Sequence, residues 1–193
     1  MEIPRPISKQ PIPENAKCVF KGVMFDVYQW EQELYDGSKT TFEKLKRPDT
    51  VVVYGVLPGG KILLVEDSQP LKKTQLCAPG GRMNAGESPE EAGARELLEE
   101  TGYVADEFIL WKSINPITKI DWAVYVFVAK GLKKVKEQNL DSGEKIKIVE
   151  MTLDEVIDTA VRDGWQDREI ERDLLLTKID SKKYEELKKL FSV

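Results

Sequence analysis

Residues 80–103 read GGRMNAGESPEEAGARELLEETGY, and this stretch combines a glycine-rich turn with the clearest predicted helix of the chain. Ser88 is a favourable N-cap, a proline follows it in the first turn, and Glu91 completes a capping box with Ser88. Gly102 is a favourable residue for the end of a helix. The sequence therefore predicts a tight turn followed by a helix over 89–101.

This helix carries a concentration of negative charge. Glu96, Glu99 and Glu100 are three and four residues apart, so they share one helix face and repel one another. Residues 87–102 contain no lysine, and their only cation, Arg95, is expected to face a different side from Glu99. A divalent cation with hard oxygen ligands would relieve the repulsion. The pattern predicts a metal site, and its alternative is a solvated surface helix.

The turn before the helix has its own supporting residues. Arg95 can pair with Glu87 and hold the loop against the helix, which is a supporting role beside a metal site. Gly80, Gly81 and Gly86 allow a tight turn, and backbone carbonyl oxygens of that turn can also reach a metal ion.

Composition narrows the chemistry. The chain of 193 residues contains no histidine, which excludes Ser-His and Cys-His nucleophile pairs and histidine metal ligands. The net charge of -5 argues against a binder of nucleic-acid backbones. Cys18 and Cys77 form no CxxC pair, so neither a disulfide framework nor a zinc ribbon is expected. With no signal sequence and no apolar run near the roughly 18 residues of a membrane span, we expect a cytoplasmic protein that binds no membrane.

The N-terminal quarter of the chain predicts a separate small sheet. Residues 1–16 are rich in proline and are expected to form a loosely held arm. Apolar and polar residues then alternate on both sides of Asp36-Gly37, which predicts an antiparallel hairpin. We therefore expect two parts, an arm with a small antiparallel sheet over 1–47 and a main domain over 48–193.

The main domain mixes strands with helices. A hairpin is predicted around Pro58-Gly59-Gly60, because β-branched runs flank these turn residues. Later segments predict a buried strand within 121–132, a strand that leads into a helix near 153–162, and helices within 167–179 and 182–191. Strands with a few interposed helices indicate a mixed α/β or α+β layered domain.

The spacing in the opening stretch matches a known pattern, the Nudix box G-x5-E-x7-R-E-U-x-E-E-x-G-U, where U is aliphatic. Chance agreement at every fixed position of this pattern is on the order of one in a hundred thousand. Tyr103 departs from the aliphatic residue usual at the last position, where we expect packing rather than chemistry. The chain therefore resembles a Nudix hydrolase, a family that cleaves a nucleoside diphosphate linked to another moiety. The seven fixed positions are Gly81, Glu87, Arg95, Glu96, Glu99, Glu100 and Gly102.

The resemblance implies a fold and a mechanism. The fold would be an α/β/α sandwich around a mixed sheet. Glu96 and Glu100 would be direct ligands of Mg²⁺ (or Mn²⁺), Glu99 a direct or water-mediated ligand, and the Gly80 carbonyl a backbone ligand. Arg95 would join Glu96 and Glu100 in the catalytic group. Water would attack phosphorus, activated by the metal and by a carboxylate base. The remaining fixed residues, Gly81, Glu87 and Gly102, would support the site.

The chain further resembles the branch of the family that acts on ADP-ribose and nucleoside diphosphate sugars, which has an N-terminal sheet and a helical tail. In that branch a glutamate five residues after a proline often serves as general base. Pro116 and Asp121 fit this spacing, although Ile117 stands where glycine is usual and Asp121 is a shorter carboxylate. Asp121 is thus the candidate base, and its alternative role is to begin a strand.

In the same branch the N-terminal sheet often pairs two subunits and supplies base-stacking groups. Tyr28, Trp30 and Arg47 are the candidates here, each with a core or interface role as the alternative, and a homodimer is expected.

Other functions stay open at this point. Pro79-Gly80-Gly81 is closer to family members that act on nucleoside triphosphates, although ADP-ribose or a nucleoside diphosphate sugar is favoured. A Nudix-fold sensor that binds a nucleotide without cleaving it usually lacks box carboxylates, and none is lacking here. An acidic interaction domain has only the low pI in its favour.

Overall fold

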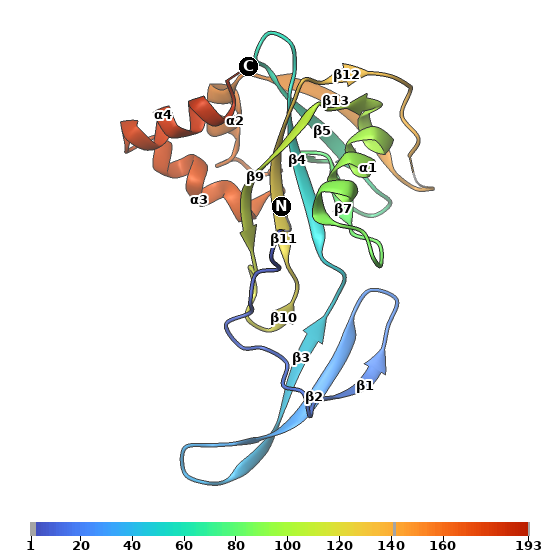
Figure 1. Ribbon diagram of the computed structural model, residues 1–193, viewed down its shortest axis with the longest axis vertical. Helices are drawn as coiled ribbons and strands as arrows, with labels where there is room; N and C mark the ends of the chain where they lie inside the picture. Colours follow the sequence, from blue (N-terminus) through green and yellow to red (C-terminus); the bar gives the residue numbers. More distant parts are fainter. Residues whose placement is uncertain (1–2, 141, 193) are drawn as a thin grey trace.

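The computed structural model describes residues 3–140 and 142–192. Residues 1–2 of the predicted N-terminal part and residues 141 and 193 of the predicted main domain lie outside the described residues. A small N-terminal sheet projects from one end of a larger body (Figure 1). Its strand order is β1-β2-β3-β10, and β2 and β3 form the hairpin predicted around Asp36-Gly37. The strands are β1 (Lys17–Lys21), β2 (Asp26–Glu33), β3 (Lys39–Lys46) and β10 (Ile120–Asp121).

The N-terminal arm is tied down, which corrects the expectation of a loosely held segment. Arg5 donates to both carboxylate oxygens of Asp49, at 2.7 and 2.9 Å. Lys44 is buried, and its Nζ donates to Ser8 Oγ and to the carbonyl oxygen of Gln10. The arm therefore closes over the side chain of Lys44, a contact between segments far apart in the sequence that no local pattern indicates.

The larger body contains a seven-stranded mixed sheet. Its central strands β4 and β11 run parallel, and the strands paired directly with them, β5, β7 and β9, run antiparallel to them. The order is β13-β5-β4-β11-β9, with β6 paired to β5 and β7 paired to β4. The strands are β4 (Thr50–Val56), β5 (Ile62–Ser68), β6 (Gln75–Cys77), β7 (Gly80–Arg82), β9 (Glu107–Ile114), β11 (Val124–Lys130) and β13 (Lys145–Met151). A further two-stranded sheet joins β8 (Tyr103–Val104) to β12 (Lys133–Lys134).

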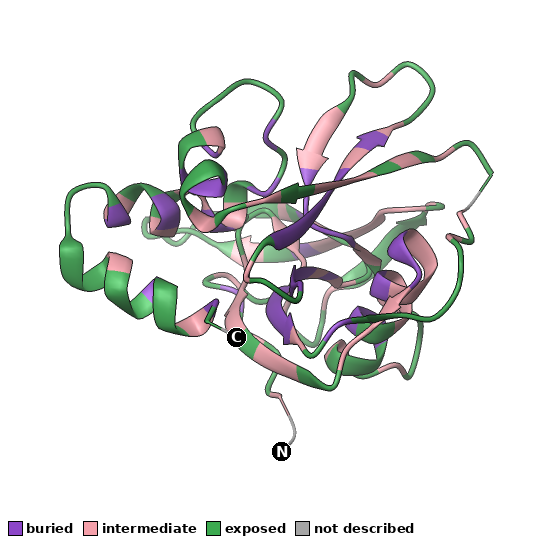
Figure 2. Cartoon of the chain, turned by 90° about the horizontal axis from the view of Figure 1, so that it is seen from above, coloured by how far each residue is buried: buried purple, intermediate pink, exposed green. Residues whose placement is uncertain are grey.

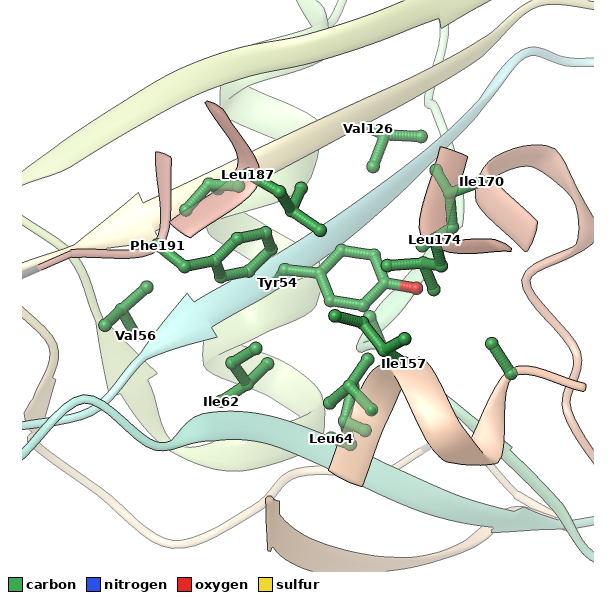
Figure 3. Close-up of a cluster of buried hydrophobic side chains, with 14 of the residues drawn as sticks. Tyr54, Val56, Ile62, Leu64, Val126, Ile157, Ile170, Leu174, Leu187 and Phe191 are labelled. Atoms are coloured by element: carbon green, nitrogen blue, oxygen red, sulfur yellow. The ribbon is translucent and has the colours of Figure 1, made fainter. Parts of the chain in front are cut away.

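Helices cover both faces of this sheet (Figure 1). The α1 helix (Pro89–Thr101) lies on one face, and α2 (Leu153–Thr159), α3 (Arg168–Thr177) and α4 (Ser181–Leu190) lie on the other. Along β4 the side chains alternate, since Val53 packs with the α1 cluster and Tyr54 packs with the α2–α4 cluster. Figure 3 shows Tyr54 surrounded by apolar side chains from α2, α3 and α4. The predicted α/β/α sandwich is confirmed.

Local signals place α1 as predicted. The Ser88 hydroxyl accepts from Glu91 N at 3.3 Å, and Glu91 Oε2 accepts from Ser88 N at 2.9 Å, so the capping box is formed. Gly102 takes a left-handed conformation with φ of 78° and donates to the carbonyl oxygen of Leu98. Its φ favours glycine, because a side chain there is strained.

The rest of the body differs from the sequence predictions at two points. The sequence patterns predict no element over residues 107–114, where β9 pairs with β11 along most of its length. The helix expected near 153–162 ends at Thr159.

Figure 2 shows buried residues concentrated in the central strands and exposed residues on the outer helix surfaces. Within the described ranges, no helix is long and apolar enough to cross a membrane.

Candidate active site

The glycine-rich strand and the acidic helix lie in direct contact. Gly80 N on β7 donates to Glu100 Oε2 on α1 at 3.1 Å. A Cβ at Gly81 would lie 2.4 Å from Glu96 Oε1, and a Cβ at Gly80 would lie 2.2 Å from the carbonyl oxygen of Val51. A larger residue at Gly80 would clash with the backbone of β4, and one at Gly81 would displace the Glu96 carboxylate. The glycines therefore bring backbone and carboxylates together.

Arg95 holds the turn and the helix in one network. It donates to both oxygens of Glu87, at 2.8 and 3.0 Å, which is the pair that the sequence predicts. It also donates to Glu96 Oε1 at 2.8 Å and to Glu99 Oε2 at 3.1 Å. The expectation that Arg95 faces a different side from Glu99 is therefore wrong. Residues four apart share a helix face, and a guanidinium group has enough donors for three carboxylates.

The electrostatics of the helix face favour a bound cation. Burial raises the pKa of Glu100 to about 9, and repulsion from Glu96 and Glu144 acts in the same direction. Burial also raises the pKa of Glu96. In contrast, the hydrogen bonds from Arg95 lower the pKa of Glu87. The fold therefore holds Glu96 and Glu100 close to other negative charges. A divalent cation would offset this repulsion.

Two adjoining cavities open on this group. The first, the carboxylate cavity, has a volume of about 510 Å³, and the second, the inner cavity, has a volume of about 390 Å³. Both are lined by Glu100, Glu144 and the three residues of β7, so they meet at the box. The carboxylate cavity adds Glu96 and Glu99. The inner cavity runs on toward β5, β11 and the segment before α3.

The donor set fits a hard divalent cation. Carboxylate oxygens of Glu96, Glu99 and Glu100 line one cavity together with Gly80, whose backbone offers a carbonyl oxygen. Within residues 3–140 and 142–192, no three or more Asp, Glu, Cys or His side chains are already grouped as ligands of one metal ion. Arg95 donates to Glu96 Oε1 and Glu99 Oε2, so these two carboxylates are directed toward the guanidinium group.

Glu144 is a site residue that the sequence did not reveal. It lies in the loop before β13 and lines both cavities. It shares the carboxylate cavity with Glu96 and Glu100, and its charge contributes to the raised pKa values of both. No fixed spacing connects it to the box, so only the folded chain brings it there.

Asp121 lies elsewhere in this chain. It is on β10 and accepts from Arg5 Nη1 at 3.0 Å. It lines a third cavity, the arm cavity, together with residues of the N-terminal arm and Tyr28. Across the part of the chain that the structure describes, it lines neither of the cavities at the box. The candidate base and the box carboxylates are therefore not brought together within one chain.

The three residues expected to stack on a base have different surroundings. Trp30 is 7% exposed and packs edge-on against Phe42, with ring centroids 6.0 Å apart. Tyr28 lies beneath the Lys46 ammonium group and lines the arm cavity. Arg47 lines the inner cavity at the box. Of the three, only Arg47 lines a box cavity within the described residues.

Comparisons with known proteins agree with the fold and the box. The model of the NUDIX domain family matches residues 46–174. The chain is 34% identical over 148 residues to ADP-ribose pyrophosphatase of Bacillus subtilis (strain 168), covering 72% of this chain and 77% of that protein. It is 33% identical over 147 residues to the methanol dehydrogenase activator of Bacillus methanolicus, covering 74% of this chain and 79% of that protein.

A solved structure supports the fold alone. A crystal structure of an ADP compounds hydrolase superposes with a TM-score of 0.70, at 21% identity, over 90% of this chain and 95% of that one.

The chain belongs to the NUDIX family and is a Nudix hydrolase. Within the family it falls in the branch similar to ADP-ribose pyrophosphatase, as the identity to the Bacillus subtilis enzyme shows.

Proposed function

We propose that this protein hydrolyses the diphosphate linkage of ADP-ribose or a nucleoside diphosphate sugar, giving a nucleoside monophosphate and a sugar phosphate. The observation that carries the proposal is the set of glutamates that line the carboxylate cavity, Glu96, Glu99, Glu100 and Glu144. The similarity to the Bacillus subtilis ADP-ribose pyrophosphatase supports the choice of substrate class.

The roles of the box residues follow from their positions. Glu96, Glu99, Glu100 and the Gly80 carbonyl would hold Mg²⁺ or Mn²⁺, which when bound neutralises the diphosphate and lowers the pKa of the attacking water. Arg95 and Glu87 hold the turn that carries Gly80 against α1. The absence of a side chain at Gly81 leaves room for the Glu96 carboxylate at the cavity wall. Positioning and charge stabilisation would supply most of the rate gain.

Glu144 is the better placed of two candidate proton acceptors. It lines both cavities, and its charge contributes to the raised pKa values of Glu96 and Glu100. Asp121, the candidate from sequence, is engaged by Arg5 and lines the arm cavity. A general base must reach the attacking water by a hydrogen bond, so we propose Glu144 for this role.

The assembly and location that we propose are a homodimer in the cytoplasm. Strand β1, at the edge of the N-terminal sheet, exposes Val19 and Phe20, which is a suitable surface for a second copy. Cys18 and Cys77 are both free, as expected in a reducing compartment.

A screen of substrates tests the reaction. ADP-ribose, sugar nucleotides, dinucleotides and nucleoside triphosphates are incubated with Mg²⁺ or Mn²⁺, and products are separated by chromatography. We expect a nucleoside monophosphate and a sugar phosphate, and Glu100→Gln should lower the rate at least roughly 100-fold through loss of a metal ligand. Glu90→Gln, an exposed glutamate of the same helix, is the matched control. Tight nucleotide binding without turnover at any metal concentration would point instead to a sensor.

A second pair of variants tests the base. Glu144→Gln should lower kcat by roughly 10²- to 10⁴-fold, because the attacking water loses its proton acceptor. Asp121→Asn should change kcat much less, because its main effect is to weaken the contact between Arg5 of the N-terminal arm and β10. The opposite ranking would assign the role to Asp121. The pH dependence of kcat gives a second reading, since a lost base removes the acidic limb of the profile.

A second candidate function is the activation of another enzyme. The similarity to the methanol dehydrogenase activator favours it, at nearly the same identity and coverage as the pyrophosphatase. Addition of the purified protein to a methanol dehydrogenase assay should then raise the dehydrogenase rate. Comparison with Glu100→Gln shows whether activation needs the hydrolytic site.

A further inference from the structure

The N-terminal arm holds an arginine against the junction between the small sheet and the larger body (Figure 1). The Arg5 guanidinium group donates to both carboxylate oxygens of Asp49, from Nε at 2.7 Å and from Nη2 at 2.9 Å, and its Nη1 donates to Asp121 at 3.0 Å. The two aspartate side chains are only 17% and 16% exposed. An isolated surface ion pair contributes little, but a paired set of hydrogen bonds within a network fixes the geometry of both partners.

The arm is preorganised to present this arginine. Pro4 and Pro6 flank Arg5, and a proline restricts its own φ and favours extended backbone at the residue before it. A second anchor lies farther along the arm, where Ser8 Oγ accepts from the buried Lys44. The arm therefore loses less conformational entropy on binding Asp49 than a flexible terminus would.

Asp49 is bonded to three other parts of the chain. Besides the arm, its backbone carbonyl oxygen accepts from Met83 N at 2.9 Å, and its Oδ1 accepts from Ala123 N at 2.8 Å. Asp49 directly precedes β4, Met83 follows β7, and Ala123 precedes β11. Asp49 thus extends the pairing of β4 with both of these neighbours by one residue. The position of its carboxylate bears on the ends of three strands.

The residues at these strand ends form walls of both cavities at the box. Met83 lines the carboxylate cavity together with the box carboxylates. Thr50 and Trp122 line the inner cavity, and Trp122 Nε1 donates to Thr50 Oγ1 at 3.0 Å. They are the sequence neighbours of Asp49 and Ala123. A shift of Asp49 would therefore reach the walls of both cavities through covalent neighbours and hydrogen bonds.

We propose that Arg5 is a positioning residue of the active site, which acts through Asp49 to hold the turn after β7 and the Trp122 wall of the inner cavity in place. This inference rests on the proposed function. Among the described residues that line the two cavities at the box Arg5 is absent, so its effect is indirect. The arm precedes the matched NUDIX domain, and the domain receives this contact from outside its own bounds.

Amide hydrogen exchange of the unliganded chain tests the link apart from turnover. NMR follows the N–H groups of Met83 and Ala123, which Asp49 holds, and the N–H group of Phe191 at the end of α4. In Arg5→Met, exchange of the first two groups should accelerate at least about threefold, because local opening becomes easier. The Phe191 N–H group should keep its rate.

Kinetics with ADP-ribose and Mg²⁺ give the second reading. Arg5→Met should raise KM about three- to tenfold, because the loosened walls bind the substrate less well. It should leave kcat within about twofold, since Arg95 and β7 still hold the α1 carboxylates. Arg5→Lys should give intermediate values, because an ammonium group keeps the attraction to Asp49 and loses the paired hydrogen bonds.

Two variants serve as controls. Arg172→Met removes an exposed arginine of α3 that lines neither cavity at the box, and it should change neither exchange nor KM. If Arg5→Met unfolds the chain, Arg5→Lys carries both measurements.

Unchanged exchange of the Met83 and Ala123 N–H groups in Arg5→Met would overturn the proposal. Equal acceleration at Phe191 would overturn it as well, because Arg5 would then stabilise the whole fold. Faster local exchange with KM unchanged would refute the role in the active site. If the unaltered chain does not hydrolyse ADP-ribose, the proposed function fails, and the exchange rates alone decide whether the arm holds the cavity walls.

Discussion

At the scale of single residues, burial and hydrogen bonding together decide the pKa of each carboxylate. Glu87 and Glu100 belong to the same box, yet hydrogen bonds from Arg95 lower the pKa of Glu87 while burial raises the pKa of Glu100. The sequence identifies both as glutamates at fixed spacing. Their surroundings distinguish them: Glu87 forms a supporting ion pair with Arg95, whereas Glu100 is a candidate ligand for a cation.

Asp167 gives a residue-scale prediction about pH. It is buried, accepts from Tyr54 and from Ala78 N, and burial raises its pKa to about 7. Between pH 4 and 7 the folded state therefore binds a proton that the unfolded state releases, so this group makes the free energy of unfolding fall as pH rises. The span is at most about 4 kcal/mol. Asp167→Asn should flatten this slope, as measured by urea unfolding across that pH range.

The control for this prediction is Asp163→Asn, an exposed aspartate nearby in the sequence. It should keep the pH dependence of the unaltered protein. Parallel slopes for Asp167→Asn and the unaltered protein would show that Asp167 does not carry the effect.

At the scale of elements, α1 was predictable because its signals are local. The capping box and the C-terminal glycine lie within the helix or next to it, and each acts through neighbours in sequence. The β9 strand was missed because its partner is β11, and pairing across a sheet leaves no such local mark.

Gly102 gives the element-scale prediction. Its φ is 78°, and a Cβ there would lie 2.0 Å from the carbonyl oxygen of Lys136. Gly102→Ala should lower the free energy of unfolding by more than the roughly 1–2 kcal/mol of a left-handed backbone alone. Gly37→Ala is the matched control, since its φ is 80° and nothing lies within 4 Å. Urea unfolding compares the two, and equal losses would show that the contact with Lys136 has no energetic consequence.

At the scale of the whole molecule, the N-terminal sheet stands apart from the layered body (Figure 1). Every residue of β1 is exposed, including Val19 and Phe20 at 52% and 61%. An edge strand with exposed apolar side chains is a surface that a second copy can cover. A stable interface buries about 1,200–2,000 Å², which requires more of the sheet than these two side chains.

The prediction at this scale concerns assembly. Phe20→Asp should convert a dimer into a monomer, as measured by light scattering after size-exclusion chromatography, because it places a charge in the apolar contact. Ile179→Asp changes an equally apolar, exposed residue of the C-terminal tail and should leave the mass unchanged. A monomeric unaltered protein, or a dimer that persists in Phe20→Asp, would refute the assignment of this surface.

The sequence by itself determined the family, the acidic helix with its caps, and the layered α/β class, because box spacing, capping and hydrophobic periodicity act over short distances. Tertiary structure alone decided which residues share the site. It brought Glu144 and Arg47 to the inner cavity beside Glu100, and it placed Asp121 against Arg5. It also turned Arg95 toward Glu99, against expectation. Contacts between segments far apart in the chain depend on how the sheet is ordered and packed, and one sequence carries no local record of that order.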